Sequence, residues 1–219
     1  KYKLGLFDDP FKYCNKEREK NDIYTKEHLD LAYEAALKSI VLLKNKNKIL
    51  PITKEVKSIA LIGPLANDKN SPLGNWRARA ENNSAVSLYE GLKEKLPKNI
   101  DLKYHIGVDY VISGENFATP LKINTTDDSK IKDAVRLAKS QELVILAVGE
   151  NAFQSGEGRS RTDITFPGLQ QQLIEEVYKA NPNTIMVLMN GRPMDISWSA
   201  QNIPAIVEAW HLGSQAGYA

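Results

Sequence analysis

The chain has 219 residues, 42% of them hydrophobic, so it can bury a full core as one large domain or as one domain with an appendage. Its 29 basic and 27 acidic side chains nearly balance, which excludes the strongly basic surface typical of nucleic-acid-binding proteins. No apolar run approaches the roughly 20 residues that cross a bilayer. We therefore expect neither nucleic acid nor a membrane as a partner. The single cysteine, Cys14, excludes an intrachain disulfide framework.

The N-terminal part of the chain has little hydrophobic periodicity. Residues 1–25 end in a charged run at 15–22, which is typical of a linker or a surface arm rather than a folding unit. Thr25 can cap a helix that follows. The predicted helix ends between residues 45 and 48, and its apolar face comprises Leu29, Ala32, Ala36, Ile40 and Leu43.

From residue 58 onwards, strand-like and helix-like segments alternate. Strands are predicted at 58–62, 102–106, 143–148, 184–189 and 204–210, and helices at 86–96, 129–139 and 170–179. Continuous apolar strands that alternate with helices indicate a largely parallel sheet with helices on both faces. Residues 26–219 are therefore expected to form a three-layer α/β/α sandwich on a sheet of about five or six strands.

Both ends of the chain lack the usual signals of a complete domain. Residues 4–11 carry no start signal, and residues 213–219 resemble the first turn of a helix that follows the last strand. A single helical turn has nothing to pack against it, so we expect the chain to be a piece of a longer protein.

One polar loop follows the predicted strand at 143–148, where α/β proteins usually place their chemistry. It holds Glu157 between two glycines, with Arg159, Arg161 and Asp163 close behind. Glycines allow tight turns that would present Glu157 outward. The alternative is a solvated loop with a surface ion pair. Glu150, directly after the strand, is a second candidate acid.

Two further loops follow strands. Residues 63–77 place Trp76 beside polar groups, where an aromatic ring suits stacking on a sugar face. The alternative for Trp76 is a packing residue under a long loop. The turn at 190–195 is interpreted as structural.

The sequence gives no support for metal or cofactor chemistry. The three histidines lie far apart and lack the spacing of zinc ligands. There is no dinucleotide-binding glycine fingerprint, no phosphate-binding P-loop and no serine nucleophile elbow. We expect neither a metal nor a cofactor.

Several segments of the chain resemble glycoside hydrolase family 3, in particular its bacterial periplasmic β-glucosidases. Residues 5–11 (GLFDDPF) resemble the segment that leaves the catalytic barrel of that family. The other similar segments follow in chain order at 39–45, 50–52, 59–66, 155–163, 190–193, 208–210 and 213–217. The resemblance thus runs along almost the whole sequence.

The resemblance implies a site shared by two domains. In the family, a (β/α)8-like barrel supplies an aspartate nucleophile in a Ser-Asp-Trp-like motif, and an α/β sandwich supplies the acid/base glutamate. This chain matches the sandwich at residues 26–219 and the preceding linker at 1–25. No Asp-Trp pair occurs in it. The chain alone is therefore expected to be inactive.

The resemblance also implies roles for the candidate residues. Glu157 corresponds to the acid/base, and Glu150 is the rival. Arg159, Arg161 and Asp163 would fix the loop by ion pairs and hydrogen bonds, and Trp76 would form a wall of the aglycone subsite. The implied substrates are β-glucosides or oligosaccharides, the implied location is periplasmic or secreted, and the second protein partner is the barrel. The alternatives are a β-xylosidase and a non-catalytic carbohydrate-binding or interaction domain, which fold alone does not exclude.

Overall fold

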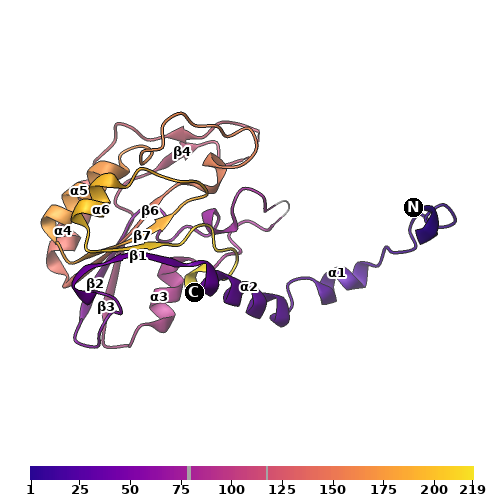
Figure 1. Cartoon of the computed structure of the whole chain (residues 1–219), viewed down its shortest axis with the longest axis horizontal. Helices are drawn as coiled ribbons and strands as arrows, with labels where there is room; N and C mark the ends of the chain where they lie inside the picture. Colours follow the sequence, from indigo (N-terminus) through magenta and orange to yellow (C-terminus); the bar gives the residue numbers. More distant parts are fainter. Residues whose placement is uncertain (78–79, 117) are drawn as a thin grey trace.

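A six-stranded sheet with the strand order β1-β8-β7-β6-β2-β3 forms the middle layer of the chain (Figure 1). The computed structural model describes residues 1–77, 80–116 and 118–219. Neighbouring strands are parallel from β8 through β3, whereas β1 runs antiparallel to β8. The strands are β1 (Val41–Asn45), β2 (Ser58–Ile62), β3 (Asp101–His105), β6 (Leu143–Gly149), β7 (Thr184–Met189) and β8 (Ala205–Glu208).

Strand β6 alternates between two hydrophobic cores, one on each face of the sheet. Leu146 belongs to the first core and Ile145 to the second. All residues of β6 are buried, as expected for a parallel strand covered on both faces. Side chains of α4 (Ile131–Ser140), α5 (Gln170–Ala180) and α6 (Ser197–Asn202) pack on the first core; α3 (Leu88–Lys95) and residues 49–56 pack on the second. The predicted three-layer α/β/α sandwich with a largely parallel sheet is confirmed.

The prediction for residues 40–45 was wrong. Helix α2 (Lys26–Ser39), capped by the Thr25 hydroxyl as predicted, ends several residues earlier than expected. The next residues form β1, which pairs with β8 and closes one edge of the sheet. The stretch from Ile40 to Leu43 is apolar and contains β-branched side chains, which suit a strand when a partner edge is available. Pairing with a distant strand therefore decides its structure, rather than the helical spacing of its side chains.

Other elements were not predicted. Helix α1 (Lys16–Asp22) lies inside the N-terminal arm, where the Asn15 side chain caps its first turn. A short hairpin of β4 (Val111–Ser113) and β5 (Lys122–Ile123) lies outside the main sheet, and α6 precedes β8. Residues after the last strand form a short 3-10 turn, Ala216–Tyr218, where the sequence suggested a helix start.

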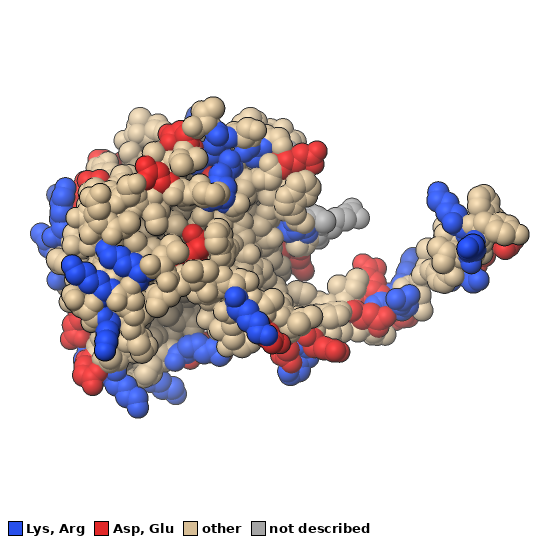
Figure 2. All heavy atoms as spheres, viewed as in Figure 1, with Lys and Arg blue, Asp and Glu red and all other residues tan. Residues whose placement is uncertain are grey.

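The N-terminal arm, residues 1–39, extends away from the sandwich from its start to the beginning of α2 (Figure 1). The last turns of α2 contact the segment after β8: Ala36 is buried, and the Ser39 carbonyl accepts the Trp210 Nε1–H at 3.1 Å. In this arm, the aromatic side chains before α2 are exposed, among them Phe7 at 75% and Phe11 at 73%. Figure 2 shows basic and acidic side chains interspersed along it, and ion pairs such as Arg18–Asp22 and Lys38–Glu34 join neighbouring turns. Within the described ranges, no helix is both long and apolar enough to cross a bilayer.

Candidate active site

The candidate site lies at the edge of the sheet where the parallel strands end. Loops 63–77, 150–163, 190–195 and 209–213 follow β2, β6, β7 and β8. Because these strands are parallel neighbours, their carboxyl ends meet at one edge, and so do the loops. This edge brings together the Glu157 loop, the Trp76 loop and the turn at 190–195.

Glu150 is completely buried directly after β6. Its Oε1 lies 2.6 Å from Arg161 Nη1, and its Oε2 lies 3.1 Å from Arg192 Nε. One carboxylate thus accepts hydrogen bonds from guanidinium groups of two different loops. Such charge-assisted bonds hold a buried carboxylate in place, and they leave Glu150 without an exposed face for a substrate.

The backbone at the end of β6 is fixed by a close approach and by a side-chain clamp. A Cβ at Gly149 would lie 1.9 Å from the Met189 carbonyl oxygen, so the position requires glycine. The amide of Gln170, which is completely buried, accepts a hydrogen bond from the Gly149 N–H at 3.0 Å and donates to its carbonyl at 2.8 Å. The start of the Glu157 loop is therefore rigidly placed.

Glu157 is exposed at the outer end of its loop. It lies between Gly156 (φ +100°) and Gly158 (φ +69°), both in the region of φ that favours glycine. Glu157 makes no hydrogen bond or ion pair with any described residue, so the surface ion pair considered from the sequence is not formed with the described part of the chain. The carboxyl group is free to meet a ligand or another domain.

Arginine and aspartate side chains hold the loop on the far side of Glu157. Arg159 donates to the carbonyl oxygens of Thr119 at 3.0 Å and Asn116 at 2.9 Å. Arg161 donates to the Thr165 carbonyl at 3.1 Å in addition to its bond with Glu150. Asp163 accepts the Thr165 N–H at 2.8 Å, and hydrogen bonds from that residue lower the pKa of Asp163. The outward carboxyl of Glu157 is thus supported by a loop that is tied down beyond it.

The Trp76 loop is packed against the Glu157 loop. The side chain of Asn75 lies so close to Gly156 that a Cβ there would be 2.6 Å from it. Arg77 lies over the Phe153 ring at 5.2 Å from its centroid. Trp76 itself is 74% exposed, which excludes the alternative that it packs under the loop. Trp76 and Glu157 are thus exposed side chains on two loops that contact each other.

Three polar residues of this edge were missed by sequence reasoning. Tyr110 is buried, and its hydroxyl accepts the Asn151 N–H at 3.0 Å; burial raises the pKa of Tyr110. Arg192, placed in a structural turn from the sequence, reaches Glu150. Burial lowers the pKa of His211, although a hydrogen bond with the Glu150 backbone acts in the opposite direction. Positions directly after strand ends were the only sequence signal for the last two.

A buried acid, Glu208, lies at the end of β8. Its carboxylate accepts the Trp210 N–H at 3.0 Å, and burial raises the pKa of Glu208. Among the described residues, no group of three or more histidine, cysteine, aspartate or glutamate side chains could hold a metal ion. The geometry at this edge is that of a proton donor or acceptor on an anchored loop, next to an exposed aromatic ring.

Comparisons with known proteins identify the family of this domain. A family model described as the glycosyl hydrolase family 3 C-terminal domain matches residues 40–219. A β-xylosidase from Formosa agariphila is 35% identical over 222 residues, which cover 99% of this chain and 29% of that protein. A periplasmic β-glucosidase from Salmonella typhimurium is 32% identical, with 100% of this chain and 30% of that protein covered.

Solved structures give the same result. A mutant β-glucosidase from Listeria innocua in complex with laminaribiose matches with a TM-score of 0.80 and 30% identity, covering 98% of this chain and 27% of that one. The chain therefore spans less than a third of the length of these relatives. From the family match over most of the sequence and the relatives that cover nearly all of it, the chain belongs to the glycosyl hydrolase family 3 C-terminal domain family.

Proposed function

We propose that this domain supplies the acid/base residue, Glu157, for retaining hydrolysis of terminal β-D-glucosides in β-glucosides or oligosaccharides. The observation that carries the proposal is the placement of Glu157. It is the exposed carboxyl on a loop anchored through Glu150 and Arg159, and it has no partner among the described residues. The rival acid, Glu150, is buried between two guanidinium groups, and its ion pairs hold the loop in place instead.

In this mechanism Glu157 begins protonated and donates its proton to the glycosidic oxygen as the leaving group departs. An aspartate attacks the anomeric carbon at the same time and forms a glycosyl-enzyme. Glu157, now a carboxylate, then takes a proton from the water that releases the sugar. Two inversions at the anomeric carbon retain its configuration.

The nucleophile belongs to a second domain in this proposal. Retaining glycosidases place their two carboxyl groups about 5–5.5 Å apart, so that domain has to meet the edge of the sheet that carries Glu157. A (β/α)8-like barrel that precedes residues 1–25 would do this, and residues 1–25 would be the linker to the sandwich at 26–219. The short share of each relative that this chain covers supports a longer parent protein. The 219-residue chain alone should then lack activity.

Trp76 is proposed as a wall of the aglycone subsite. Its ring is exposed on the loop that packs against the Glu157 loop, so a sugar held at Glu157 could stack on it. Arg159, Arg161 and Asp163 are positioning residues in this account, because their hydrogen bonds end on the protein itself.

The proposed sugar specificity and the proposed cellular location are both based on the names of the relatives. One is named a β-xylosidase and another a periplasmic β-glucosidase, so a β-xylosidase is the alternative within the class. Periplasmic or secreted location is proposed from the second name. Comparing kcat/KM of the full-length protein for aryl β-glucosides and aryl β-xylosides decides between the two sugars.

Chemical rescue tests the role of Glu157. In the full-length protein, Glu157→Ala should lose the general base that activates water in the second step, and azide, which needs no base, should restore turnover by attacking the glycosyl-enzyme. The product should be a β-glycosyl azide, because two inversions have taken place. Glu55→Ala is the matched control: Glu55 is exposed at the opposite end of β2, and its replacement should give neither the loss nor the azide product. An unchanged rate in Glu157→Ala, or no azide product, would favour a non-catalytic carbohydrate-binding domain or an acid elsewhere.

A further inference from the structure

A pocket of about 360 Å³ opens at the edge of the sheet opposite the candidate active site. Its walls come from the turn that follows β1, from the end of α5 and from the segments that lead into β7 and β8. Because β1 is antiparallel to β8, the carboxyl end of β1 meets the amino ends of the other strands. This reversal brings Lys46 and Asn47 to the same pocket as Tyr178 of α5.

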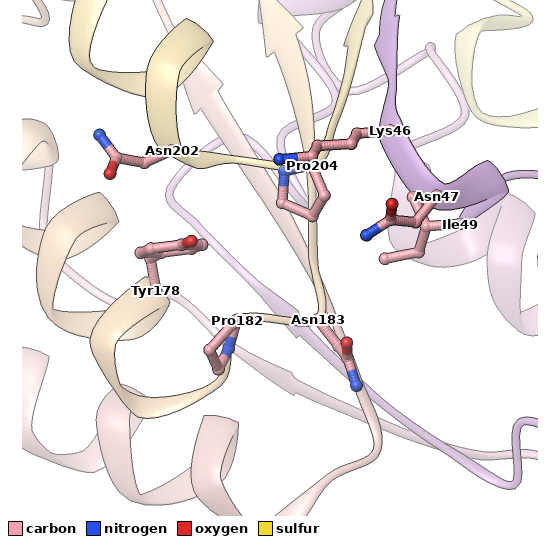
Figure 3. A pocket seen from close by; sticks show the side chains of 8 residues that line it. All are labelled: Lys46, Asn47, Ile49, Tyr178, Pro182, Asn183, Asn202 and Pro204. Carbon is pink, nitrogen blue, oxygen red and sulfur yellow. The ribbon is translucent and has the colours of Figure 1, made fainter.

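Figure 3 shows how these side chains lie. The Tyr178 ring and the Asn47 amide lie on opposite sides of the hollow, and Lys46 extends over it beside Pro204. The Tyr178 hydroxyl, the Lys46 ammonium and the Asn47 amide make no hydrogen bond with any described side chain or backbone group. Three polar groups of different chemistry therefore line one hollow, each without a hydrogen-bond partner among the described residues.

The walls of this pocket are held in place. The Lys46 N–H donates to the Pro204 carbonyl at 2.7 Å. The Tyr178 ring packs edge-on against Trp198, with 5.7 Å between centroids and 88° between planes. Asn47 keeps φ at 60°, a left-handed conformation that asparagine tolerates better than most residues. A pre-formed pocket of this kind loses little entropy when it binds a ligand.

The lining chemistry selects the class of ligand. Asparagine amides and a tyrosine hydroxyl both donate and accept, and prolines and an aromatic ring supply apolar faces. A sugar ring matches this mixture, because it carries hydroxyl groups around its edge and apolar C–H groups on its faces. Among the described residues, no carboxylate lines the pocket, so a cation would find no counter-charge there, and one exposed lysine is a weak anchor for a multivalent anion. The volume is at the lower end of small-molecule sites, about 300–1,000 Å³, which suits a mono- or disaccharide.

We propose that this pocket, called here the Tyr178 pocket, binds a neutral sugar unit of an oligosaccharide independently of the Glu157 edge. The pocket is open and its bonds are few, so the dissociation constant should be on the order of 1 mM. Such a site would hold a longer glycan on the protein without taking part in bond cleavage.

The test is an NMR titration of the isotope-labelled 219-residue chain with laminaribiose, xylobiose and, separately, inorganic phosphate. Saturable shifts should appear in backbone amides at 46–49, 178–181, 183 and 202–203 on addition of at least one of the disaccharides. Asn47→Gly is compatible with the left-handed backbone and removes the whole side chain with its amide, and Tyr178→Phe keeps the ring and removes only the hydroxyl. Each should weaken sugar binding about 3- to 10-fold, the range expected for one lost hydrogen bond.

Trp76→Ala is the control at the other edge. It should leave the shifts of the Tyr178 pocket unchanged, whatever it does to residues around Glu157, so that failure of one site is distinguishable from failure of the other. The proposal is overturned if neither disaccharide shifts these amides, if both pocket variants bind as tightly as the parent chain, or if phosphate alone produces the shifts. Asn47→Gly in the full-length protein should also leave turnover of a small aryl glycoside unchanged; a changed turnover would contradict independence from the Glu157 edge.

Discussion

Arg161 closes onto Glu150 across the loop that carries Glu157, with 2.6 Å between Arg161 Nη1 and Glu150 Oε1. The ion pair joins the two ends of the segment at 150–161, so Glu157 lies on a closed Ω-like excursion rather than on a free strand connection. Arg192 adds a second bond from the neighbouring strand end. The position of the proposed acid/base therefore depends on a buried carboxylate, to which the proposed mechanism gives no chemical step.

Removing Glu150 should destabilise the chain strongly. Glu150→Ala leaves the guanidinium groups of Arg161 and Arg192 half-buried without their partner, and breaking a buried pair costs about 3–5 kcal/mol. Urea unfolding of the 219-residue chain measures this. Glu157→Ala, at an exposed position on the same loop, is the control and should stay within about 0.5 kcal/mol. Equal effects of the two substitutions would mean that Glu150 does not anchor the loop.

Arg159 should hold the Glu157 loop against Asn116 and Thr119. Arg159→Ala removes two hydrogen bonds to carbonyl oxygens of that segment, so amide exchange within 155–161 should become faster. Arg159→Lys keeps the charge, but a lysine ammonium lacks the planar guanidinium that reaches both carbonyls. This variant should restore the protection of these amides from exchange only in part. In the full-length protein, kcat should fall with little change in melting temperature. If amide exchange is unaltered in Arg159→Ala, then Arg159 does not position the Glu157 loop.

Truncation to alanine should change the stability of the chain little at Trp76 and strongly at Trp198. Trp76 is 74% exposed, so Trp76→Ala should barely change the melting temperature while raising KM of the full-length protein for disaccharides. Trp198 packs on the core and against Tyr178, so Trp198→Ala should cost about 3–5 kcal/mol. A large loss of stability in Trp76→Ala, or an unchanged KM, would contradict its place in the aglycone subsite.

Stability should fall as the pH is lowered through the histidine range. Burial lowers the pKa of His211 from its usual 6.5, and the native state therefore binds fewer protons there than the unfolded chain. The free energy of unfolding should decrease as the pH falls from about 6.5 towards the native pKa, and His211→Gln should make that dependence shallower. Burial lowers the pKa of His105 in the same direction, so part of the slope should remain.

Urea unfolding between about pH 5 and 7.5 measures this dependence. His28→Gln, at an exposed position on α2, serves as the matched control and should leave the slope as it is. A slope that does not change in His211→Gln would show that this buried histidine does not titrate differently on folding.

The sheet was predictable because its central strands are continuous apolar runs. Strand β6 is buried on both faces, so its composition alone indicates its place in the middle of a parallel sheet. Strand β1 was assigned to a helix because its short apolar stretch fits both periods, and only pairing with β8 decides between them. The hairpin of β4 and β5 is too short to leave a periodic signal.

The candidate site was predictable only where it is local in sequence. The loop with Glu157 and the arginines close behind it stand out through their glycines and charges. Gln170, Tyr110 and Arg192 contact the start of that loop from segments at least 20 residues away. Such contacts depend on the order of the strands in the sheet. The spacing of residues along the sequence does not reveal that order.

The most direct test of the account is the leaving-group dependence of Glu157→Ala in the full-length protein. An activated aryl glycoside leaves without a proton, whereas an alkyl glycoside or a disaccharide needs one. The account predicts a loss of about 10²–10⁴-fold in kcat/KM on the poor leaving groups and a far smaller loss on the activated one. Equal losses on both kinds of substrate would contradict it and would move the acid/base role away from Glu157.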